Sequence, residues 1–324
     1  MKLLRRLTLT LLALLLVVLI AVLQIASNRI AIPPRNELLP GQISILAEPN
    51  DSGMSITESL ASDQTPYLLA LPHSPLSKTG TLLQEQLRAR GTQLTDQLRG
   101  TILLLHGFGG SKEDNLRITE RFTAAGFACI MPDLPGQGSH PHNSASFGRR
   151  EVPLLNNLVL ELQNKHQLPT NTAVFGISQG GAIALQLAAQ HPETFQTVVS
   201  LSTFANLAEI IARSTKHNSI SKPLLPLVDW NTRLRFGFRP SQISPESAAQ
   251  HITIPTYLAH GEQDQLIPPS HAQRIFQNLS TPHKKLRLVA DANHNNVLAK
   301  GHLIYADIVS FLLTHAASPA STKS

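Results

Sequence analysis

The 324-residue sequence is short of cysteine, with Cys129 as its single thiol. One cysteine excludes any disulfide bond within the chain. Cys129 lies inside the apolar run 127–131, where we expect a buried and chemically inert side chain. No cysteine follows the N-terminal apolar segment, so the sequence gives no support for a lipid anchor.

Basic tracts and cofactor motifs are also missing. The formal charge of +6 is not gathered into a basic run with interleaved aromatic residues, which argues against nucleic-acid binding. The glycines 107, 109 and 110 lack the Gly-Lys-Ser/Thr ending of a P-loop and the spacing of a dinucleotide site. The pair His140 and His142 flanks a proline and gives no assured chelating geometry. We therefore expect no cofactor and no metal.

What the N-terminus does contain is an uncharged stretch of 20 residues, Leu7 to Ala26. A helix of about 20 apolar residues spans the hydrocarbon core of a bilayer. A cleaved signal peptide has a shorter apolar region and a small-x-small cleavage site. Here Gln24 occupies a position that should be small, so we favour an uncleaved signal-anchor over residues 1–26, with a cleaved signal as the alternative.

Three basic residues precede this stretch: Lys2, Arg5 and Arg6. Basic flanks tend to stay in the cytoplasm, which predicts a single-pass membrane protein whose main domain is extracytoplasmic. Arg29 and Arg35 on the other side weaken this prediction without reversing it.

After the anchor, residues 27–64 are rich in Pro, Asn, Ser and Gly, and we interpret them as a stalk. A single domain is expected over 65–317, followed by a polar tail at 318–324. Short aliphatic runs bounded by turn residues predict strands: Tyr67–Leu71, Thr101–Leu105, Ala128–Met131, Thr172–Gly176, Thr197–Leu201, Thr256–Ala259 and Leu286–Val289. Helical patterns alternate with these strands: Glu113–Ala125, Glu151–His166, Gln179–Gln190, Ser270–Leu279 and His302–Thr314. This alternation predicts an α/β fold, with a mostly parallel central sheet and helices on both faces.

The interval from about 203 to 255 interrupts the alternation. A structureless loop of that length is improbable in a compact domain, so we expect a helical cap insertion. Its cations outnumber its acids: Arg213, Lys216, Lys222, Arg233, Arg235 and Arg239 against Glu209, Asp229 and Glu246. We hypothesise that the cap faces an anionic membrane surface or an acidic substrate.

The motif Gly176-Ile177-Ser178-Gln179-Gly180 stands between a predicted strand and a predicted helix. This arrangement resembles the nucleophile elbow of α/β-hydrolases. A serine on so tight a turn has a strained backbone, and glycines two positions away on either side relieve the crowding. Ser178 is therefore the candidate nucleophile.

A serine nucleophile needs a base, and the base needs an orienting acid. Asp264 follows one late strand and His294 follows the last strand, which gives the chain order serine, acid, histidine. Glu262 is the alternative acid, and His302 is the alternative base.

The region Thr101–Thr314 resembles the α/β-hydrolase superfamily, in the group of esterases, monoacylglycerol lipase-like enzymes and proline-type aminopeptidases. The resemblance includes the oxyanion loop His106–Gly110, the turn Asp133–Ser139 and the acid-bearing loop His260–Pro268. One departure is Asn293, where the family often has glycine before the histidine. Asparagine tolerates left-handed backbone geometry, so we expect the turn to form.

The resemblance implies a catalytic triad of Ser178, Asp264 and His294, with the backbone N–H groups of Phe108 and Gln179 as the oxyanion hole. The implied activity is hydrolysis of a carboxylic ester, possibly of a lipid-like acyl ester at the membrane. A proline-type aminopeptidase and an acyltransferase are the enzymatic alternatives. A binding protein on a hydrolase scaffold is the alternative outside enzymes.

Overall fold

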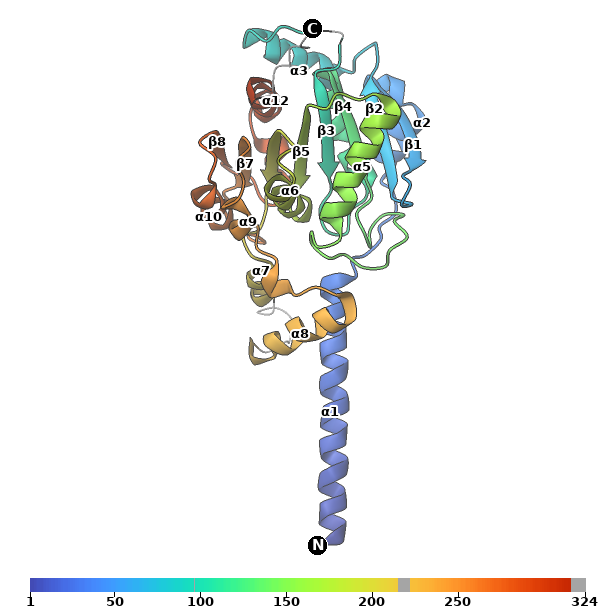
Figure 1. Ribbon diagram of the computed structural model, residues 1–324, viewed down its shortest axis with the longest axis vertical. Coiled ribbons are helices and arrows are strands. Elements are labelled where there is room, and N and C mark those ends of the chain that lie inside the picture. Colours follow the sequence, from blue (N-terminus) through green and yellow to red (C-terminus); the bar gives the residue numbers. More distant parts are fainter. Residues whose placement is uncertain (96, 215–221, 316–324) are drawn as a thin grey trace.

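The computed structural model describes residues 1–95, 97–214 and 222–315, in which a body of strands and helices sits at one end of a long helix (Figure 1). The predicted tail at 318–324 lies outside the described residues, as does Lys216 of the cap.

The body is built on one eight-stranded sheet with the order β1-β2-β4-β3-β5-β6-β7-β8. The strands are β1 (Met54–Leu60), β2 (Pro66–Pro72), β3 (Gly100–Leu105), β4 (Phe127–Pro132), β5 (Thr172–Ile177), β6 (Thr197–Leu201), β7 (Thr256–Gly261) and β8 (Lys284–Val289). Strand β2 is antiparallel to both of its neighbours, and all pairs from β4 to β8 are parallel. The predicted mostly parallel sheet is confirmed.

Helices cover both faces of this sheet, as expected. One face is covered by α3 (Lys78–Ala89), α4 (Leu116–Ala124) and α12 (Ile304–His315). The other face is covered by α5 (Glu151–His166), α6 (Gln179–Gln190), α9 (Pro245–Ala249) and α10 (Ser270–Asn278). The shorter helices are α2 (Pro40–Ala47), α7 (Leu207–Ser214), α8 (Leu225–Phe236), α11 (Val297–Lys300) and the 3₁₀ turns η1 (Pro49–Ser52), η2 (Lys112–Asn115), η3 (Lys222–Leu224) and η4 (Pro240–Gln242).

Alternate residues of the central strands bury their side chains in two different cores. In β3, Leu103 and Leu105 join the core under α5 and α6, whereas Ile102 and Leu104 join the core under α4 and α12. This alternation follows from the two-residue period of a strand. A parallel strand covered on both faces is therefore a continuous apolar run, which is why these strands were predictable.

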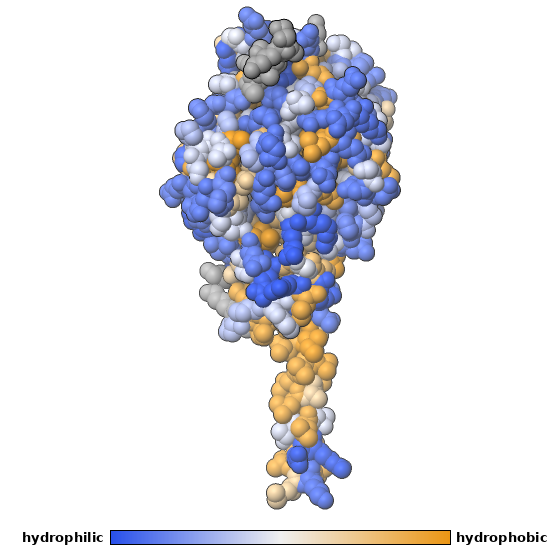
Figure 2. Space-filling view, in the orientation of Figure 1, coloured by the Kyte–Doolittle hydropathy of each residue, from blue (hydrophilic) through white to orange (hydrophobic). Residues whose placement is uncertain are grey.

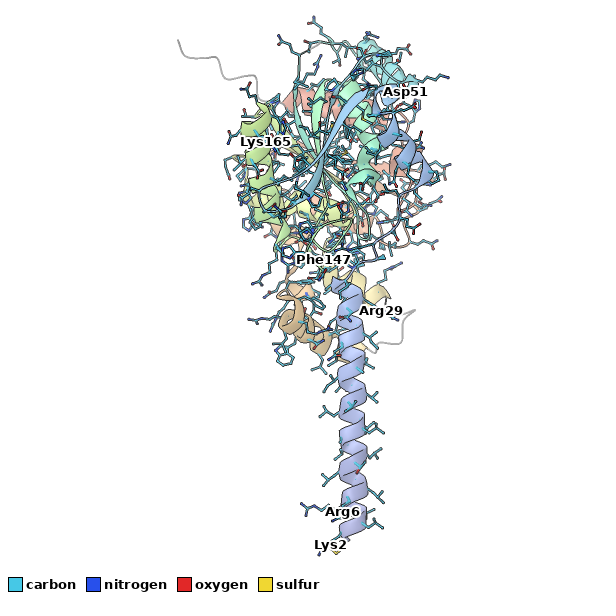
Figure 3. The ribbon with its side chains drawn as sticks, turned by 90° about the vertical axis from the view of Figure 1, so that its right-hand side faces the viewer. Lys2, Arg6, Arg29, Asp51, Phe147 and Lys165 are labelled. Carbon is cyan, nitrogen blue, oxygen red and sulfur yellow. The ribbon has the colours of Figure 1, made fainter. Side chains whose placement is uncertain are left out.

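The N-terminal helix α1 (Lys2–Ala31) is 30 residues long and extends away from the body (Figures 1 and 3). It is long and apolar enough to cross a membrane, with a mean hydropathy of 3.0 over its most apolar window, of which 6% is buried. The helix surface is apolar along most of its length, and its free end carries polar residues that include Lys2 and Arg6 (Figures 2 and 3). The helix continues to Ala31, five residues beyond the predicted anchor, because its last turns pack against the body.

The interpretation of residues 27–64 as a stalk needs correction. Helix α2 lies within this range, and β1 pairs with β2 in the register Met54↔Pro72 to Leu60↔Pro66. The edge strand β1 buries only Met54 fully and exposes several polar residues, so it lacks the apolar run of a central strand. The sheet consequently begins at Met54, before the predicted boundary at 65.

The predicted cap insertion is confirmed between β6 and β7, where α7, α8 and α9 lie with two 3₁₀ turns. Helix α8 crosses the C-terminal part of α1 below the body (Figure 1).

Candidate active site

Ser178 lies on the sharp turn that connects β5 to α6. Its backbone has φ 55° and ψ −115°, a strained conformation for a residue with a side chain. Ser178 immediately precedes the first residue of α6, Gln179, so the N–H groups of the first turn of that helix lie beside its hydroxyl. The predicted strand–turn–helix setting of the motif is present.

Two glycines allow this turn to form. A Cβ atom on Gly176 would lie 2.2 Å from the carbonyl oxygen of Gly180, and one on Gly180 would lie 2.3 Å from that of Leu105. Both distances are far inside van der Waals contact with backbone atoms that cannot move away. Glycine at these positions is therefore a steric requirement of the elbow.

The structure brings Ser178, His294 and Asp264 together from three strand ends. The His294 Nε2 atom lies 3.1 Å from the Ser178 Oγ atom, and the His294 Nδ1 atom lies 2.7 Å from the Asp264 Oδ2 atom. An ionised carboxylate only accepts hydrogen bonds, so Nδ1 carries the hydrogen and Nε2 is left to accept one from the serine. The arrangement can transfer a proton from the serine hydroxyl to the imidazole.

Asp264 is held as a charged acceptor. Its Oδ1 atom accepts the N–H groups of Leu266 at 3.0 Å and Ile267 at 2.8 Å, and His260 Nε2 lies 3.2 Å from its Oδ2 atom. Burial on its own would raise the pKa of Asp264, but the hydrogen bonds from His260, His294 and Ile267 outweigh burial and hold it well below its usual range. The carboxylate is thus negative at every pH at which the protein is expected to work.

The alternative acid and base do not take part in this arrangement. Glu262 and His302 are both exposed, and within the described part of the chain neither forms a hydrogen bond with Ser178, Asp264 or His294. The turn before His294 forms as expected, although its left-handed residue is Asp291, at φ 57°. Asn293 contributes by accepting the Asn295 N–H group on its Oδ1 atom at 3.0 Å.

The two predicted oxyanion donors lie on either side of the serine. Gly107 brings the loop to the elbow, because a Cβ atom built there would lie 3.7 Å from the Ser178 Cβ atom. Among the described residues, no acceptor pairs with the backbone N–H of Phe108 or of Gln179. Both N–H groups are therefore available to a negatively charged oxygen bound at Ser178.

Sequence reasoning missed the side chain that joins these two donors. Gln137 is fully buried, and its Oε1 atom accepts the Gly109 N–H group at 2.6 Å. Its Nε2 atom donates to Gln179 Oε1 at 3.1 Å. Gln137 thus ties the loop that carries Phe108 to the first residue of α6. The signal in the sequence is its place in the turn motif Asp133–Ser139, which by itself indicates only the fold.

His106 holds the same loop through two hydrogen bonds. Its Nε2 atom accepts the Leu134 N–H group at 3.0 Å, and its Nδ1 atom donates to the Gly107 carbonyl oxygen at 2.9 Å. Complete burial lowers the pKa of His106, so its ring stays neutral and can both donate and accept. The side chain has no free nitrogen with which to act as a base.

Ser178 opens into a cavity of about 320 Å³ with an apolar lining. The lining comprises Ala26, Arg29, Ile30, Phe108, Phe147, Ser178, Gln179, Phe204, Leu207, Ile210, Ile211, Leu266 and Ile267. Arg29 is the one charged residue in this set, and no carboxylate belongs to it. We name it the serine cavity.

Three of the lining residues belong to α1, for which the sequence predicts only the role of an anchor. Figure 3 shows Arg29 where α1 meets the body, close to Phe147 at the lower end of the body. The carbonyl oxygen of Ala31 also accepts the Ala145 N–H group at 2.8 Å. No local pattern in the sequence could have indicated these contacts, because they join segments more than one hundred residues apart.

The fold and this serine–histidine–aspartate array define a protein of the α/β-hydrolase class. A family model described as the alpha/beta hydrolase fold matches residues 100–233 and 221–300, and the chain belongs to that family. Among curated proteins, the chain is 22% identical over 211 residues to a thermostable monoacylglycerol lipase of Bacillus sp. (strain H-257), covering 60% of this chain and 82% of the lipase. It is also 26% identical over 216 residues to an uncharacterized protein of Bacillus subtilis (strain 168), covering 66% of this chain and 70% of that protein.

Solved structures share the fold at low identity. An esterase of Pyrococcus furiosus superposes with a TM-score of 0.65 at 18% identity, covering 89% of this chain and 99% of the esterase. A membrane phospholipase A superposes with a TM-score of 0.57 at 18% identity, covering 97% of this chain and 100% of the phospholipase. At these identities the solved structures show the shared fold, whereas the family match and the curated lipase support an esterase-like or lipase-like hydrolase.

Proposed function

We propose that the chain is a membrane-tethered serine hydrolase that cleaves carboxylic esters with an apolar acyl group. The observation that carries this proposal is the array of Ser178, His294 and Asp264, with contacts of 3.1 and 2.7 Å, whose serine lines an apolar cavity. The oriented base gives Ser178 the activation that a serine hydroxyl needs.

In the acylation step, His294 Nε2 takes the proton of the Ser178 hydroxyl as Oγ attacks the ester carbonyl carbon. The carbonyl electron pair moves to oxygen, and the N–H groups of Phe108 and Gln179 bind that oxyanion. Asp264 stabilises the imidazolium that forms. When the tetrahedral intermediate collapses, the carbon–oxygen bond to the alcohol breaks and the alcohol leaves with the proton from His294.

In the second step, His294 removes a proton from a water molecule as the water attacks the acyl-enzyme. A second oxyanion forms in the same donor pair, and its collapse releases the carboxylic acid. Ser178 recovers its proton from His294, so the enzyme returns to its starting state. An alcohol in place of water would make the same site an acyltransferase.

The cavity lining favours an acyl ester over a peptide substrate. An aminopeptidase needs carboxylates to hold the substrate's ammonium group, and the described lining of the serine cavity contains none. Its aliphatic and aromatic side chains suit an acyl chain, which gains about 0.8 kcal/mol for each buried CH₂ group. A monoacylglycerol lipase among the relatives supports the same substrate class.

Helix α1 supports the membrane part of the proposal. Lys2, Arg5 and Arg6 precede the apolar stretch, so we propose that the N-terminus is cytoplasmic and the catalytic domain extracytoplasmic. The C-terminal turns of α1 contribute Ala26, and cleavage after this residue would cut through the wall of the serine cavity. An uncleaved anchor is therefore our proposal.

The function is tested with the full chain in detergent micelles and a series of p-nitrophenyl esters of increasing acyl length. The expected result is hydrolysis that rises from acetyl to medium-length acyl groups and that is abolished in Ser178→Ala. Thr203→Ser serves as a matched control, because Thr203 lies beside the elbow and its hydroxyl contact with the Ser178 carbonyl is kept. Hydrolysis by Ser178→Ala at the rate of the parent protein would refute the proposal. Faster product formation with an added alcohol acceptor would identify an acyltransferase.

A further inference from the structure

A second cavity, of about 470 Å³, adjoins the serine cavity. Both cavities are lined by Ile30 of α1 and Ile211 of α7, so these two side chains form their shared boundary. The second cavity extends to α8, whose residues Leu225, Val228 and Trp230 belong to its lining. The two cavities therefore adjoin along α1 near the crossing with α8. We name the second the α8 cavity; its lining is mostly apolar and also includes Asp229, Arg239 and Ser241.

Specific hydrogen bonds fix α8 against α1. The Asn231 Nδ2 atom donates to the Leu23 carbonyl oxygen at 3.1 Å and to Ser27 Oγ at 2.9 Å. The Arg235 guanidinium donates to the Gln24 carbonyl oxygen at 3.0 Å. These bonds fix the position of α8 along the axis of α1.

This position places α8 at the surface of a bilayer that α1 spans. The charged residues at the N-terminal end of α1 stop at Arg6 and the next charged residue of the helix is Arg29. About 20 residues at a rise of 1.5 Å are needed to span the hydrocarbon core. A span that starts at Leu7 ends near Ala26. The hydrogen bonds with α8 begin at Leu23, about one helical turn before that end. A bilayer that accommodates α1 must therefore meet α8 at its hydrocarbon–headgroup boundary.

The exposed side of α8 has the composition that this boundary favours. Leu227, Trp230 and Leu234 are 42%, 53% and 62% exposed, and their spacing of three and four residues puts them on one stripe of the helix. Asn231 and Thr232 lie on the adjoining face of the helix and contact α1. Tryptophan is enriched at membrane interfaces, and Arg233 and Arg235 in the last turn suit anionic headgroups. We name Leu227, Trp230 and Leu234 the α8 stripe.

We propose that the α8 stripe inserts into the surface of the bilayer and that the acyl substrate enters laterally from the lipid, through the α8 cavity and along α1 to Ser178. Helix α1 is then a wall of the substrate path as well as an anchor. The identity of the substrate rests on the proposed function, whereas the contact between α8 and lipid stands on the geometry of α1 and α8.

The insertion can be measured directly, because Trp230 is the one tryptophan of the whole chain. The full chain is reconstituted into phosphatidylcholine/phosphatidylglycerol vesicles that contain lipids brominated at defined depths of the acyl chain. We expect quenching of Trp230 fluorescence, strongest for bromine near the headgroup, and weak quenching by aqueous acrylamide. Emission quenched by acrylamide and untouched by brominated lipid would overturn the proposal. Shielding from both quenchers would overturn it too, since it would mean that a second copy of the chain covers the stripe.

The substrate route is tested with the double variant Leu227→Asn/Leu234→Asn, which retains Trp230. Neither leucine lines either cavity. We expect turnover of a long-chain ester presented in vesicles to fall about tenfold, with unchanged turnover of a short water-soluble ester. The matched control is Leu82→Asn/Leu160→Asn, since these leucines are 53% and 43% exposed on α3 and α5, which lie on the body away from α1.

These outcomes separate the inference from the proposed function. Equal losses for the vesicle ester and the soluble ester, or equal losses in the control, would overturn lateral entry. If wild type and all variants hydrolyse neither ester, the proposed function fails, and the quenching of Trp230 still decides whether α8 contacts lipid.

Discussion

Replacing Gln137 by leucine tests how the oxyanion loop is held. The substitution keeps the approximate volume of the side chain and removes both of its hydrogen bonds, to Gly109 N–H at 2.6 Å and to Gln179 Oε1 at 3.1 Å. Each polar group left buried without a partner costs about 1 to 3 kcal/mol. With two groups left without partners, we expect a total loss of about 2 to 6 kcal/mol in the free energy of unfolding. At about 2 to 4 °C per kcal/mol, this lowers Tm by roughly 4 to 24 °C.

The same substitution should reduce catalysis, because Gly109 follows the donor Phe108 in the loop. Complete loss of one oxyanion donor costs about 100- to 1000-fold in kcat, which is the ceiling for a loop that is loosened but not removed. We expect kcat for a soluble ester to fall about 10- to 100-fold, equivalent to about 1.4 to 2.7 kcal/mol of transition-state stabilisation. KM should change less than kcat, because Phe108 and Gln179 are the two residues of the cavity lining beside the substituted side chain and the rest of the lining is kept.

The control for Gln137 is another buried glutamine, Gln163. Its Nε2 atom donates to Thr172 Oγ1 at 2.8 Å, at the end of β5 opposite the elbow. Gln163→Leu should therefore lower Tm and leave kcat unchanged. The reasoning is refuted if the two variants lose similar stability and Gln137→Leu keeps the kcat of the parent protein.

Three further predictions concern the triad, the elbow and the membrane topology. Asp264→Asn should lower kcat by about 10⁴-fold, since the neutral amide no longer fixes the histidine tautomer. Because the pKa of Asp264 is lower in the folded protein than in the unfolded chain, its ionised carboxylate stabilises the fold above the ordinary carboxyl pKa, and this stabilisation is lost as the pH falls below about 4. The difference in free energy of unfolding between wild type and Asp264→Asn, measured by denaturant titration, should therefore become smaller below that pH. Gly180→Ala should yield protein that neither binds an active-site serine probe nor melts cooperatively, because its Cβ atom would lie 2.3 Å from the Leu105 oxygen; a cooperative melt with normal labelling would disprove this. Alkaline phosphatase fused to the C-terminus should be active in a bacterial host, and an inactive but intact fusion would reverse the proposed topology.

The parts of the site that could be predicted from sequence are those fixed by local pattern. The motif around Ser178 has glycines where a serine on a tight turn needs them. Asp264 and His294 each follow an apolar strand, in the order that the fold requires. Their contacts then follow from the parallel sheet, because the carboxyl ends of neighbouring strands meet at one edge. Sequence could therefore indicate the fold and the candidate triad together.

Contacts between distant segments could not be predicted in the same way. Ser27 and Asn231 lie 204 positions apart, and their pairing leaves no periodic signal in either segment. The edge strand β1 was missed because its exposed polar residues give it the composition of a loop. Gln137 is a buried polar residue in a turn, and only its partners reveal what it holds in place.

The most direct test of the central claim is to locate the nucleophile by mass spectrometry. The full chain in detergent is treated with a fluorophosphonate, digested and mapped beside Ser178→Ala and His294→Ala. The account predicts one phosphonylated residue, Ser178, with no labelling in Ser178→Ala and labelling slowed by orders of magnitude in His294→Ala. Modification of another residue, or a folded wild-type protein that takes up no probe, would contradict it.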